Sequence, residues 1–382
     1  MSYIAEKWAQ GSTFALDLEA LNTYEDIIDL SIGDPDFTTD SAVIDAAMQD
    51  AHRGYTHYGV PQGDPELIAE IVDFWAQDYG LKISAQQVLV TPSSALGMAQ
   101  TLMALLNPGE EVVVFSPYFP IYTQQIYLAG GVTTEVALSA CAGYEVDAQA
   151  LEAAITPRTK AVIVNNPVNP TGVTWSRESL EVVAQIAQAH DLVVIADEIY
   201  TDLVFDPTRP LIPFSSLEGM ASRTVTLNSF SKNYMMTGWR IGFAVAPPQI
   251  IAAMSRISDS LEYAATSVSQ RAALHALRMR RQLRQKYVAE FGRRLNYVAD
   301  RLAAMQHFEL VRPSGTFYLF PRFTAAPLSG GEVRELLLHR AHVLVSPGEA
   351  FGSHTAGHVR LACTVEQPKL VEACDRLERL RI

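Results

Sequence analysis

Short apolar runs alternate with stretches of helical periodicity through the middle of the chain. The runs lie at residues 88–90, 112–115, 132–137, 161–164, 192–196, 224–228 and 241–245. Helical spacing fills several of the intervals between them, for example residues 176–190. Strands that are apolar along their whole length are typical of a parallel sheet that helices bury on both faces. The pattern predicts an α/β fold with a mainly parallel sheet of about seven strands, flanked by helices.

The two ends of the chain show a different pattern. Helical spacing predicts a helix over residues 41–53 and a strongly helical chain beyond about residue 250, and a short amphipathic helix is expected before Gly11. Residues 27–32, 315–320 and 358–362 are strand-like. We therefore predict two domains, a large one over residues 49–285 and a smaller α+β domain formed by residues 1–48 and 286–382.

Two helices carry further signals. Asp64 followed by Pro65 predicts a helix start, because aspartate caps free amides and proline suits the first helical position. Residues 270–304 combine arginines with apolar residues at helical spacing. The apolar positions are Leu274, Leu277, Leu283, Tyr287, Phe291, Leu295 and Val298. This spacing favours a solvated polar face over a nucleic-acid surface for the arginines. They are Arg271, Arg278, Arg280, Arg281, Arg284, Arg293, Arg294 and Arg301.

Composition and charge restrict the class of protein. Of 382 residues, 48% are hydrophobic and 19% charged, as in globular proteins with a large core, and the formal net charge is −13. This balance argues against nucleic acid or an anionic membrane surface as the main partner, although a local pair of arginines can bind a small anion. The three cysteines lack metal-ligand spacing, and the sequence shows neither a leader nor a bilayer-spanning apolar run. We expect a cytoplasmic protein.

One lysine stands out by its position. The chain has six lysines and twenty-three arginines, and Lys232 follows the predicted strand at 224–228 among small and apolar residues. A solvated loop residue is the ordinary interpretation, but a desolvated lysine can form a Schiff base with a carbonyl. Ser229 and Arg240, which lie close in sequence, suit a phosphate. Pyridoxal phosphate, a carbonyl compound that carries a phosphate, would use all three residues.

Two other strand ends carry small or polar residues. Ser94 and Ala95 open a predicted helix, whose free backbone amides could bind a phosphate, although serine is also an ordinary helix cap. Residues 165–172 read Asn-Asn-Pro-Val-Asn-Pro-Thr-Gly. Their prolines predict a rigid turn that presents the amide of Asn169, or a turn with no further role.

Two charged residues lie in or after apolar strands. Asp197 directly follows such a strand, where it could hold a pyridinium nitrogen in its protonated form while Tyr200 reaches the ring oxygen. A metal-binding acid or a helix cap is the alternative. Arg360 lies within a predicted strand, and either a substrate carboxylate or a structural ion pair would explain it.

Together these motifs resemble those of the class I aminotransferases, the aspartate aminotransferase-like group of fold type I pyridoxal phosphate enzymes. The resemblance extends from about Ile28 to the C-terminus. It implies that Lys232 forms a Schiff base with the cofactor and later moves the proton between the substrate Cα and the cofactor. It also implies that Asp197 pairs with the pyridine nitrogen, with Asn169 and Tyr200 on the ring oxygen.

The resemblance implies roles for the remaining site residues. Phe119 matches the aromatic residue that stacks on the cofactor ring, although neighbouring Tyr118 leaves that register open. Arg360 would bind the substrate's α-carboxylate with help from the Gly33 amide. Tyr58 matches a tyrosine that reaches the partner subunit's phosphate, which implies a homodimer with shared active sites. The residues implied to bind the phosphate are Ser94, Ala95, Ser229 and Arg240.

The resemblance leaves the amino donor open. Some aspartate-specific members have Gly-Gly-Lys where this chain has Ser93-Ser94-Ala95, and loss of that lysine puts a preference for aspartate in doubt. Phe14 lies in the segment that covers the substrate in this family and favours an apolar or aromatic side chain. We expect an aminotransferase of apolar, aromatic or broad preference that uses a 2-oxo acid acceptor such as 2-oxoglutarate by a ping-pong mechanism.

Other interpretations stay open. On the same fold, the chain could be an aspartate aminotransferase proper or a β-elimination carbon–sulfur lyase that releases pyruvate and ammonia. A cofactor-binding regulator usually has an added DNA-binding domain, which we do not expect here. A nicotinamide dehydrogenase would also use an α/β sheet, but no Gly-x-Gly-x-x-Gly motif follows a predicted strand.

Overall fold

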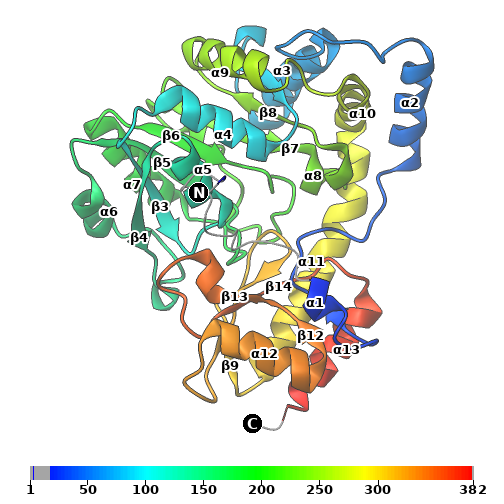
Figure 1. Ribbon diagram of the computed structural model, residues 1–382, viewed down its shortest axis with the longest axis vertical. Helices are drawn as coiled ribbons and strands as arrows, with labels where there is room; N and C mark the ends of the chain where they lie inside the picture. Colours follow the sequence, from blue (N-terminus) through cyan, green and yellow to red (C-terminus); the bar gives the residue numbers. More distant parts are fainter. Residues whose placement is uncertain (1–2, 4–17, 381–382) are drawn as a thin grey trace.

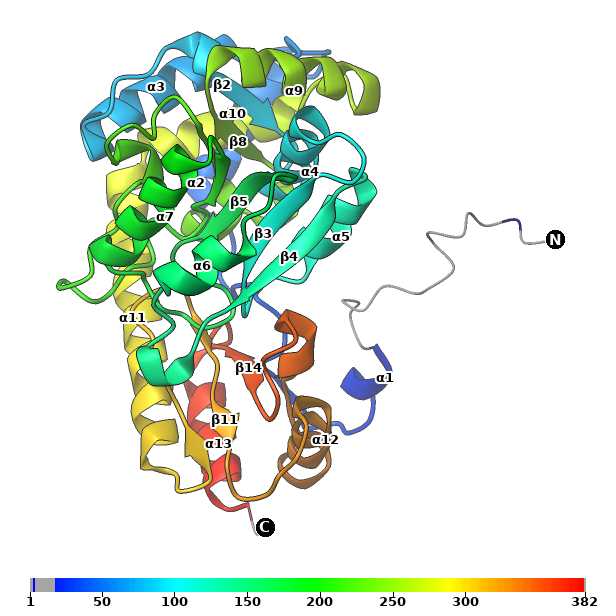
Figure 2. The same ribbon diagram turned by 90° about the vertical axis from the view of Figure 1, so that its left-hand side faces the viewer.

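The computed structural model describes residue 3 and residues 18–380. Its central sheet consists of β2 Val88–Thr91, β3 Glu111–Ser116, β4 Val132–Ala137, β5 Thr159–Asn165, β6 Val193–Asp197, β7 Thr224–Ser229 and β8 Gly242–Val245. The strands are hydrogen-bonded in the order β2-β8-β7-β6-β5-β3-β4, and Figures 1 and 2 show the sheet from two sides. β8 is antiparallel to both neighbours, and the other neighbouring pairs are parallel. The predicted α/β fold with a mainly parallel sheet is confirmed.

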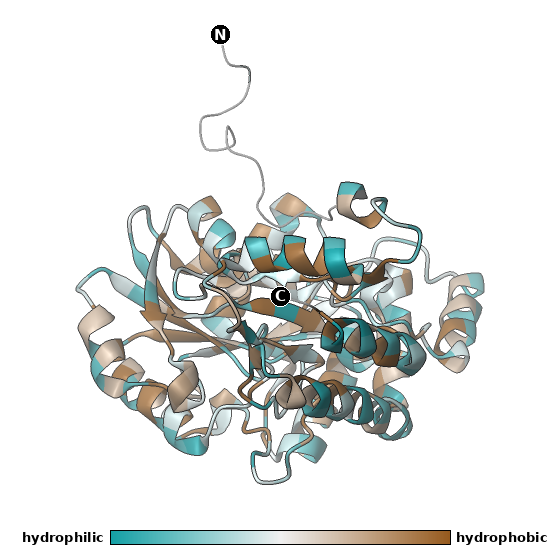
Figure 3. Cartoon of the chain, turned by 90° about the horizontal axis from the view of Figure 1, so that it is seen from below, coloured by the Kyte–Doolittle hydropathy of each residue, from teal (hydrophilic) through white to brown (hydrophobic). Residues whose placement is uncertain are grey.

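Helices cover both faces of this sheet. They are α4 Ser94–Leu105, α5 Ile121–Leu128, α6 Ala148–Ala154, α7 Arg177–Ala189 and α9 Pro248–Leu261. Val162 of β5 packs in one cluster with Leu180 of α7, while the next residue, Ile163, packs in another with Met98 of α4. Successive strand residues point to opposite faces, so a strand covered on both sides is apolar throughout. Figure 3 shows mostly hydrophobic strands between helices of mixed character.

The helix starts predicted before the sheet are confirmed. α2 spans Ser41–His52 and α3 spans Pro65–Tyr79. The Asp64 carboxylate accepts a hydrogen bond of 2.8 Å from the Glu66 amide, as expected of an N-cap residue. α10, Ser267–Arg278, packs against both helices. Within the described part of the chain, no helix is both long and apolar enough to cross a membrane.

The C-terminal part combines long helices with short strands. Figure 1 shows α11, Arg280–Ala304, running from the sheet region to this part. The other elements are α1 Leu18–Leu21, α12 Gly330–Ala341, α13 Gln367–Glu378, β1 Ile28–Asp29, β9 Phe308–Glu309, β10 Tyr318–Leu319, β11 Arg322–Phe323, β12 Val343–Leu344, β13 Ser346–Pro347 and β14 Val359–Ala362. β1 pairs in parallel with β12, so the N-terminal segment joins the C-terminal part. The residue bounds of the two predicted domains stay a prediction.

Short turns of 3-10 helix complete the described elements. They are η2 Ala85–Gln87, η3 Ala140–Ala142, η4 Phe214–Ser216, η5 Thr237–Trp239 and η6 Gly348–Phe351. Two predicted strands are shorter than expected, because residues 27–32 contribute only Ile28–Asp29 and residues 315–320 only Tyr318–Leu319. In each case the partner strand pairs over two residues. The helix expected before Gly11 lies outside the described residues.

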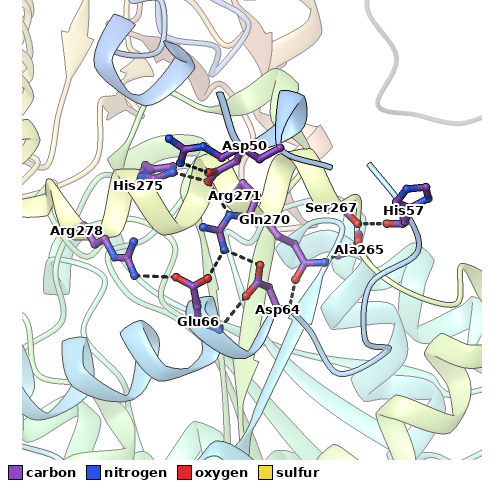
Figure 4. A network of polar contacts seen from close by, with 11 residues as sticks. Asp50, His57, Asp64, Glu66, Ala265, Ser267, Gln270, Arg271, His275 and Arg278 are labelled. Carbon is purple, nitrogen blue, oxygen red and sulfur yellow. Dashed lines mark hydrogen bonds and ion pairs between the residues drawn. The ribbon is translucent and has the colours of Figure 1, made fainter. Parts of the chain in front are cut away.

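The prediction for the arginine-rich helices is right for the apolar positions and wrong for three arginines. All the apolar positions named above are buried. Arg271, Arg280 and Arg294 are buried as well, instead of forming a solvated face. Figure 4 shows how Arg271 contacts Asp50 at 2.7 Å, and it also pairs with Asp64 at 3.1 Å. Paired carboxylates offset the cost of burying the guanidinium, and they come from helices about 200 residues away in sequence.

Candidate active site

The polar ends of three parallel strands meet at one edge of the central sheet. β5 ends at Asn165, β6 at Asp197 and β7 at Ser229, and Asn165 lies opposite Asp197 in the strand register. Because β8 is antiparallel, it begins at this same edge with Gly242, opposite Ser229. Arg240 therefore also lies at this edge. This is the edge where parallel α/β sheets bind their ligands.

A cavity of about 890 Å³ opens at this edge. Nearly all the predicted site residues line it. They are Gly33, Ser94, Ala95, Phe119, Asn169, Asp197, Tyr200, Ser229, Lys232, Arg240 and Arg360. Tyr58 does not line the cavity of its own chain, and the residue is 92% exposed. The segment that contains Phe14 lies outside the described residues.

Lys232 lies on the short helix α8, Phe230–Asn233, directly after β7. The hydroxyl of Ser229 accepts a hydrogen bond from the Ser231 amide and so caps this helix. The Lys232 Nζ donates a hydrogen bond to the Gly33 carbonyl oxygen. Burial is the main cause that lowers the pKa of Lys232 to about 8, and the positive charges of Arg360 and Arg240 add to it. A lysine in this environment loses its proton more readily than one in water.

Asp197 is buried at the end of β6. Tyr122 of α5 donates a short hydrogen bond to Oδ2 of Asp197, and the Asn165 side chain donates to the Asp197 backbone carbonyl at 2.9 Å. Burial raises the pKa of Asp197 to about 6, although the Tyr122 hydrogen bond opposes the rise. Oδ1 of Asp197 is buried without a well-aligned hydrogen-bond partner among the described residues. The Ile199 backbone also lowers the pKa of this carboxylate, and Oδ1 keeps acceptor capacity for a ligand in the cavity.

Arg360 lies in β14, opposite Ser346 of β13. Its guanidinium donates to Oδ1 of Asn169 at 3.0 Å and to the carbonyl oxygen of Ser31 at 2.6 Å. The ring of Tyr318 lies 4.5 Å from the guanidinium carbon. Burial lowers the pKa of Arg360, because the low-dielectric surroundings disfavour its charge. Among its described neighbours the guanidinium thus contacts neutral oxygens and an aromatic ring.

The N-terminus of α4 and the start of β8 form the opposite end of the cavity. Ser94 and Ala95 begin α4, where backbone amides lack partners within the helix. A side chain at Gly242 would place Cβ 2.8 Å from the Ser94 amide nitrogen and 2.7 Å from the Asn228 carbonyl oxygen. Only glycine lets these backbones approach so closely. Arg240, two residues before Gly242, adopts a left-handed conformation, with φ of 53°.

The structure distinguishes Phe119 from its neighbour. Phe119 lines the cavity, whereas the hydroxyl of Tyr118 turns away and donates to Glu135 at 2.6 Å. Phe119 also contacts Tyr122 edge to face, with ring centroids 5.7 Å apart. Of these two aromatic residues, Phe119 is the one that lines the cavity.

Tyr58 lies in the loop between α2 and α3. Its ring contacts Tyr263 edge to face, with ring centroids 5.5 Å apart. The Ser267 hydroxyl of α10 donates to the His57 carbonyl oxygen at 2.6 Å, a contact visible in Figure 4. This loop is therefore anchored to its own chain while the Tyr58 side chain points into solvent.

Several site residues escaped the sequence reasoning. Tyr122, Asn165, Ser231 and Tyr318 all line the cavity. Asn165 and Ser231 fall inside the motifs described above, in which neighbouring residues have the predicted roles. Tyr122 and Tyr318 lie in ordinary apolar patterns, which give no local sign of a polar function. A Cβ atom on Gly33 would lie 1.7 Å from the Tyr318 hydroxyl. The Tyr318 side chain can therefore occupy this position only because residue 33 is glycine.

Comparisons with known proteins show the family of this chain. The family model for aminotransferase class I and II matches residues 25–377. The chain is 36% identical over 359 residues to an aromatic-amino-acid aminotransferase 2 of Thermococcus litoralis and, over the same length, 36% identical to an aspartate aminotransferase of Pyrococcus abyssi. Each alignment covers 93% of this chain and 92% of the relative.

A solved structure is similar over nearly the whole chain as well. The aromatic aminotransferase from Pyrococcus horikoshii superposes with a TM-score of 0.90 at 35% identity. The match covers 94% of this chain and 97% of that one. The chain therefore belongs to the class I and II aminotransferases and is a transaminase, an enzyme that exchanges amino groups between small amino acids and oxo acids.

Proposed function

We propose that this transaminase uses pyridoxal phosphate to move the amino group of an L-α-amino acid to a 2-oxo acid, with 2-oxoglutarate as the acceptor. The observation that carries the proposal is the placement of Lys232, whose pKa is lowered to about 8, in the cavity that Asp197 and Arg360 also line. A nucleophilic amine, a buried carboxylate and a carboxylate-binding guanidinium are the groups that this reaction requires.

The residues present fit this cofactor. The buried Oδ1 of Asp197, which lacks a well-aligned partner, suits a protonated ring nitrogen, and the amides of Ser94 and Ala95 suit a phosphate. Ser229 and Arg240 would complete the phosphate site, Asn169 and Tyr200 would serve the ring oxygen, and Phe119 would lie against the ring. When bound, pyridoxal phosphate supplies an electrophilic carbonyl and a protonated ring that withdraws electrons from the substrate Cα.

The chain's own residues bind the substrate and move its proton. Arg360 binds the α-carboxylate in a forked geometry, assisted by Asn169 and the backbone of Gly33. This contact would hold the substrate Cα in the cavity that Lys232 also lines. Because the pKa of Lys232 is lowered, its amine can accept the Cα proton near neutral pH. The same amine would then deliver this proton to the cofactor. Tyr200 is buried and its pKa is raised, so its hydroxyl stays protonated and donates a hydrogen bond.

The substrate end of the cavity supports an apolar, aromatic or broad preference. Ile32, Ile121, Leu344 and Val345 line the cavity besides Phe119. The similar proteins differ among themselves, because one is named for aromatic amino acids and another for aspartate. A screen that mixes the cofactor-loaded protein with single amino acids and measures the released 2-oxo acid tests this. Aspartate turned over far faster than phenylalanine, methionine or leucine would favour an aspartate aminotransferase instead.

The carbon–sulfur lyase remains the second candidate on this fold, since a Lys232 amine beside a cavity would also serve β-elimination. Release of pyruvate and ammonia from cystathionine without any added oxo acid would favour it. Exchange that requires alternate amino and oxo acids, with parallel lines in double-reciprocal plots, would support the ping-pong transaminase.

The core assignment has a direct test. We expect Lys232→Ala to abolish amino-group transfer, because no other lysine lines the cavity among the described residues. Lys160, which lies outside the cavity on β5, provides the control Lys160→Ala, expected to keep full turnover. Full activity of Lys232→Ala would contradict the assignment.

We also propose a cytoplasmic homodimer with shared active sites. The 92% exposure of Tyr58 supports this, because an anchored loop presents a large aromatic side chain to solvent instead of to its own cavity. Tyr58 would then complete the phosphate site of the partner subunit. Sedimentation of the purified chain as a monomer would contradict the shared site.

A further inference from the structure

A second cavity lies between the sheet region and the C-terminal part of the chain. Its volume is about 330 Å³, which is at the lower end of the range for small-ligand sites. The sheet region supplies Val173, Phe205 and Arg209 to its lining, and the C-terminal part supplies Arg312 and Ser314. Among the described residues, none lines both this cavity and the active-site cavity. The proposed function gives the second cavity no role.

Two charged side chains of the second cavity keep unused hydrogen-bonding capacity. Nη1 of Arg209 donates to Oε1 of Glu145 at 2.6 Å and to the Thr174 carbonyl oxygen at 3.0 Å. The described residues leave Nε and Nη2 of the same guanidinium without a partner. Oδ1 of Asp206, which also lines the cavity, accepts two hydrogen bonds from Thr208, and Oδ2 has no described partner. The cavity therefore offers both a cationic donor and an anionic acceptor.

Arg312 adds a guanidinium that can turn toward a ligand. It pairs with Asp300 at 2.6 Å, and the two side chains are 56% and 67% exposed. An ion pair so exposed contributes little to stability, so a ligand carboxylate can replace Asp300 at small cost. Val173, Phe205 and Val311 form an apolar part of the lining. Guanidinium, carboxylate and apolar groups match the carboxylate, the ammonium and the side chain of an apolar α-amino acid.

Three segments of the chain connect the two cavities. Each segment places one residue in the second cavity and one in the active-site cavity, namely Val173 and Asn169, Phe205 and Tyr200, and Ser314 and Tyr318. Backbone hydrogen bonds join these segments to one another. The Ser314 amide donates to the Gly172 carbonyl oxygen at 2.9 Å, and the Phe205 amide donates to the Ser314 carbonyl oxygen at 2.8 Å. A ligand in the second cavity therefore contacts all three segments that carry these active-site residues.

We propose that the second cavity binds an apolar α-amino acid and thereby strengthens binding of the amino donor in the active-site cavity. The ligand holds the three segments in one arrangement, so less of the chain has to be ordered when the donor binds. Amino acids are the compounds that this transaminase exchanges, so its own donor or product can be the ligand. Binding in the second cavity does not depend on the proposed function, whereas the effect on the donor does.

The first test measures binding directly. Equilibrium dialysis of the cofactor-loaded protein uses 2-methylleucine, an apolar amino acid that lacks the Cα proton and so is not transaminated. We expect Arg312→Gln and Asp206→Asn each to weaken one set of binding sites about tenfold or more, because each removes a hydrogen bond between charged groups. Arg322→Gln removes an exposed arginine outside both cavities and should bind as the unaltered protein does. Identical binding curves in all four proteins would overturn the proposal.

The second test measures the effect on the active site. In the unaltered protein and in Arg322→Gln, the rate should rise more steeply than a hyperbola with donor concentration, because the donor fills both cavities. Arg312→Gln and Asp206→Asn should give hyperbolas with half-saturation at about fivefold higher donor concentration. Hyperbolas in all four proteins would overturn the effect on donor binding. Absence of amino-group transfer in the unaltered protein would instead overturn the proposed function and leave the dialysis result intact.

Discussion

The hydrogen bond from Tyr122 to Asp197 offers a sharp test of the cofactor site. Tyr122→Phe removes the hydroxyl and keeps the buried ring, so packing changes little. Tyr122 donates to the ionised carboxylate and therefore lowers the pKa of Asp197, which burial raises to about 6. A hydrogen bond to a charged group contributes about 1.5–3 kcal/mol, which corresponds to about one to two pKa units. The variant should have an Asp197 pKa of about 7–8.

The sign of the activity change follows from the form of Asp197 that is required. Only the carboxylate can hold a protonated ring nitrogen, so activity falls as pH drops through the pKa of Asp197. With a pKa raised from about 6 to about 7–8, the ionised fraction at pH 7 falls from about 90% to between about 50% and 10%. We expect the acid limb of kcat/KM in the variant to lie about one to two pH units higher than in the unaltered protein, with a difference under about twofold at pH 9.

The assay is the pH profile of kcat/KM for the amino donor between pH 5 and pH 9, with each protein loaded with pyridoxal phosphate. The quantity tested is the difference in pH between the acid limbs of the variant and of the unaltered protein. The absolute position of each limb also depends on the bound cofactor, because the cofactor acts on the pKa of Asp197. Tyr127→Phe is the matched control, since Tyr127 lies on the same helix but is 56% exposed and outside the cavity. Coincident acid limbs in Tyr122→Phe and Tyr127→Phe would refute the reasoning.

Two further predictions concern the phosphate end and the lysine. Gly242→Ala should weaken pyridoxal phosphate binding at least about tenfold, because the added Cβ would lie 2.8 Å from the Ser94 nitrogen. Titration with the cofactor measures this loss. The control Gly238→Ala should show no such loss, because its Cβ meets open space. Lys232→Met should stabilise the cofactor-free protein toward urea by up to about 3 kcal/mol at pH 7, because folding lowers the Lys232 pKa from 10.5 to about 8. This cost of a buried charge is complete below pH 8 and disappears above pH 10.5, so a stability difference that did not narrow by pH 10 would count against it.

The sequence predicted the fold class because the relevant signals are local. Apolar runs such as residues 161–164 and 192–196 can be buried on both faces only by covering helices, and helix signals such as Asp64-Pro65 act over a few residues. The motifs after these runs had to converge, because the carboxyl ends of parallel strands share one edge of the sheet. Placement of Asn169, Asp197 and Lys232 in one cavity followed from that rule.

The tertiary structure decided what depends on partners distant in sequence. Arg271 looked like a surface residue of an amphipathic helix, and only the packing of α2, α3 and α10 brings Asp50 and Asp64 to it. Tyr122 likewise looked like an ordinary core residue until α5 placed its hydroxyl on Asp197. Hydrophobic periodicity reports which side of an element is buried. It carries no information about which polar group lies opposite, because that depends on how whole elements pack.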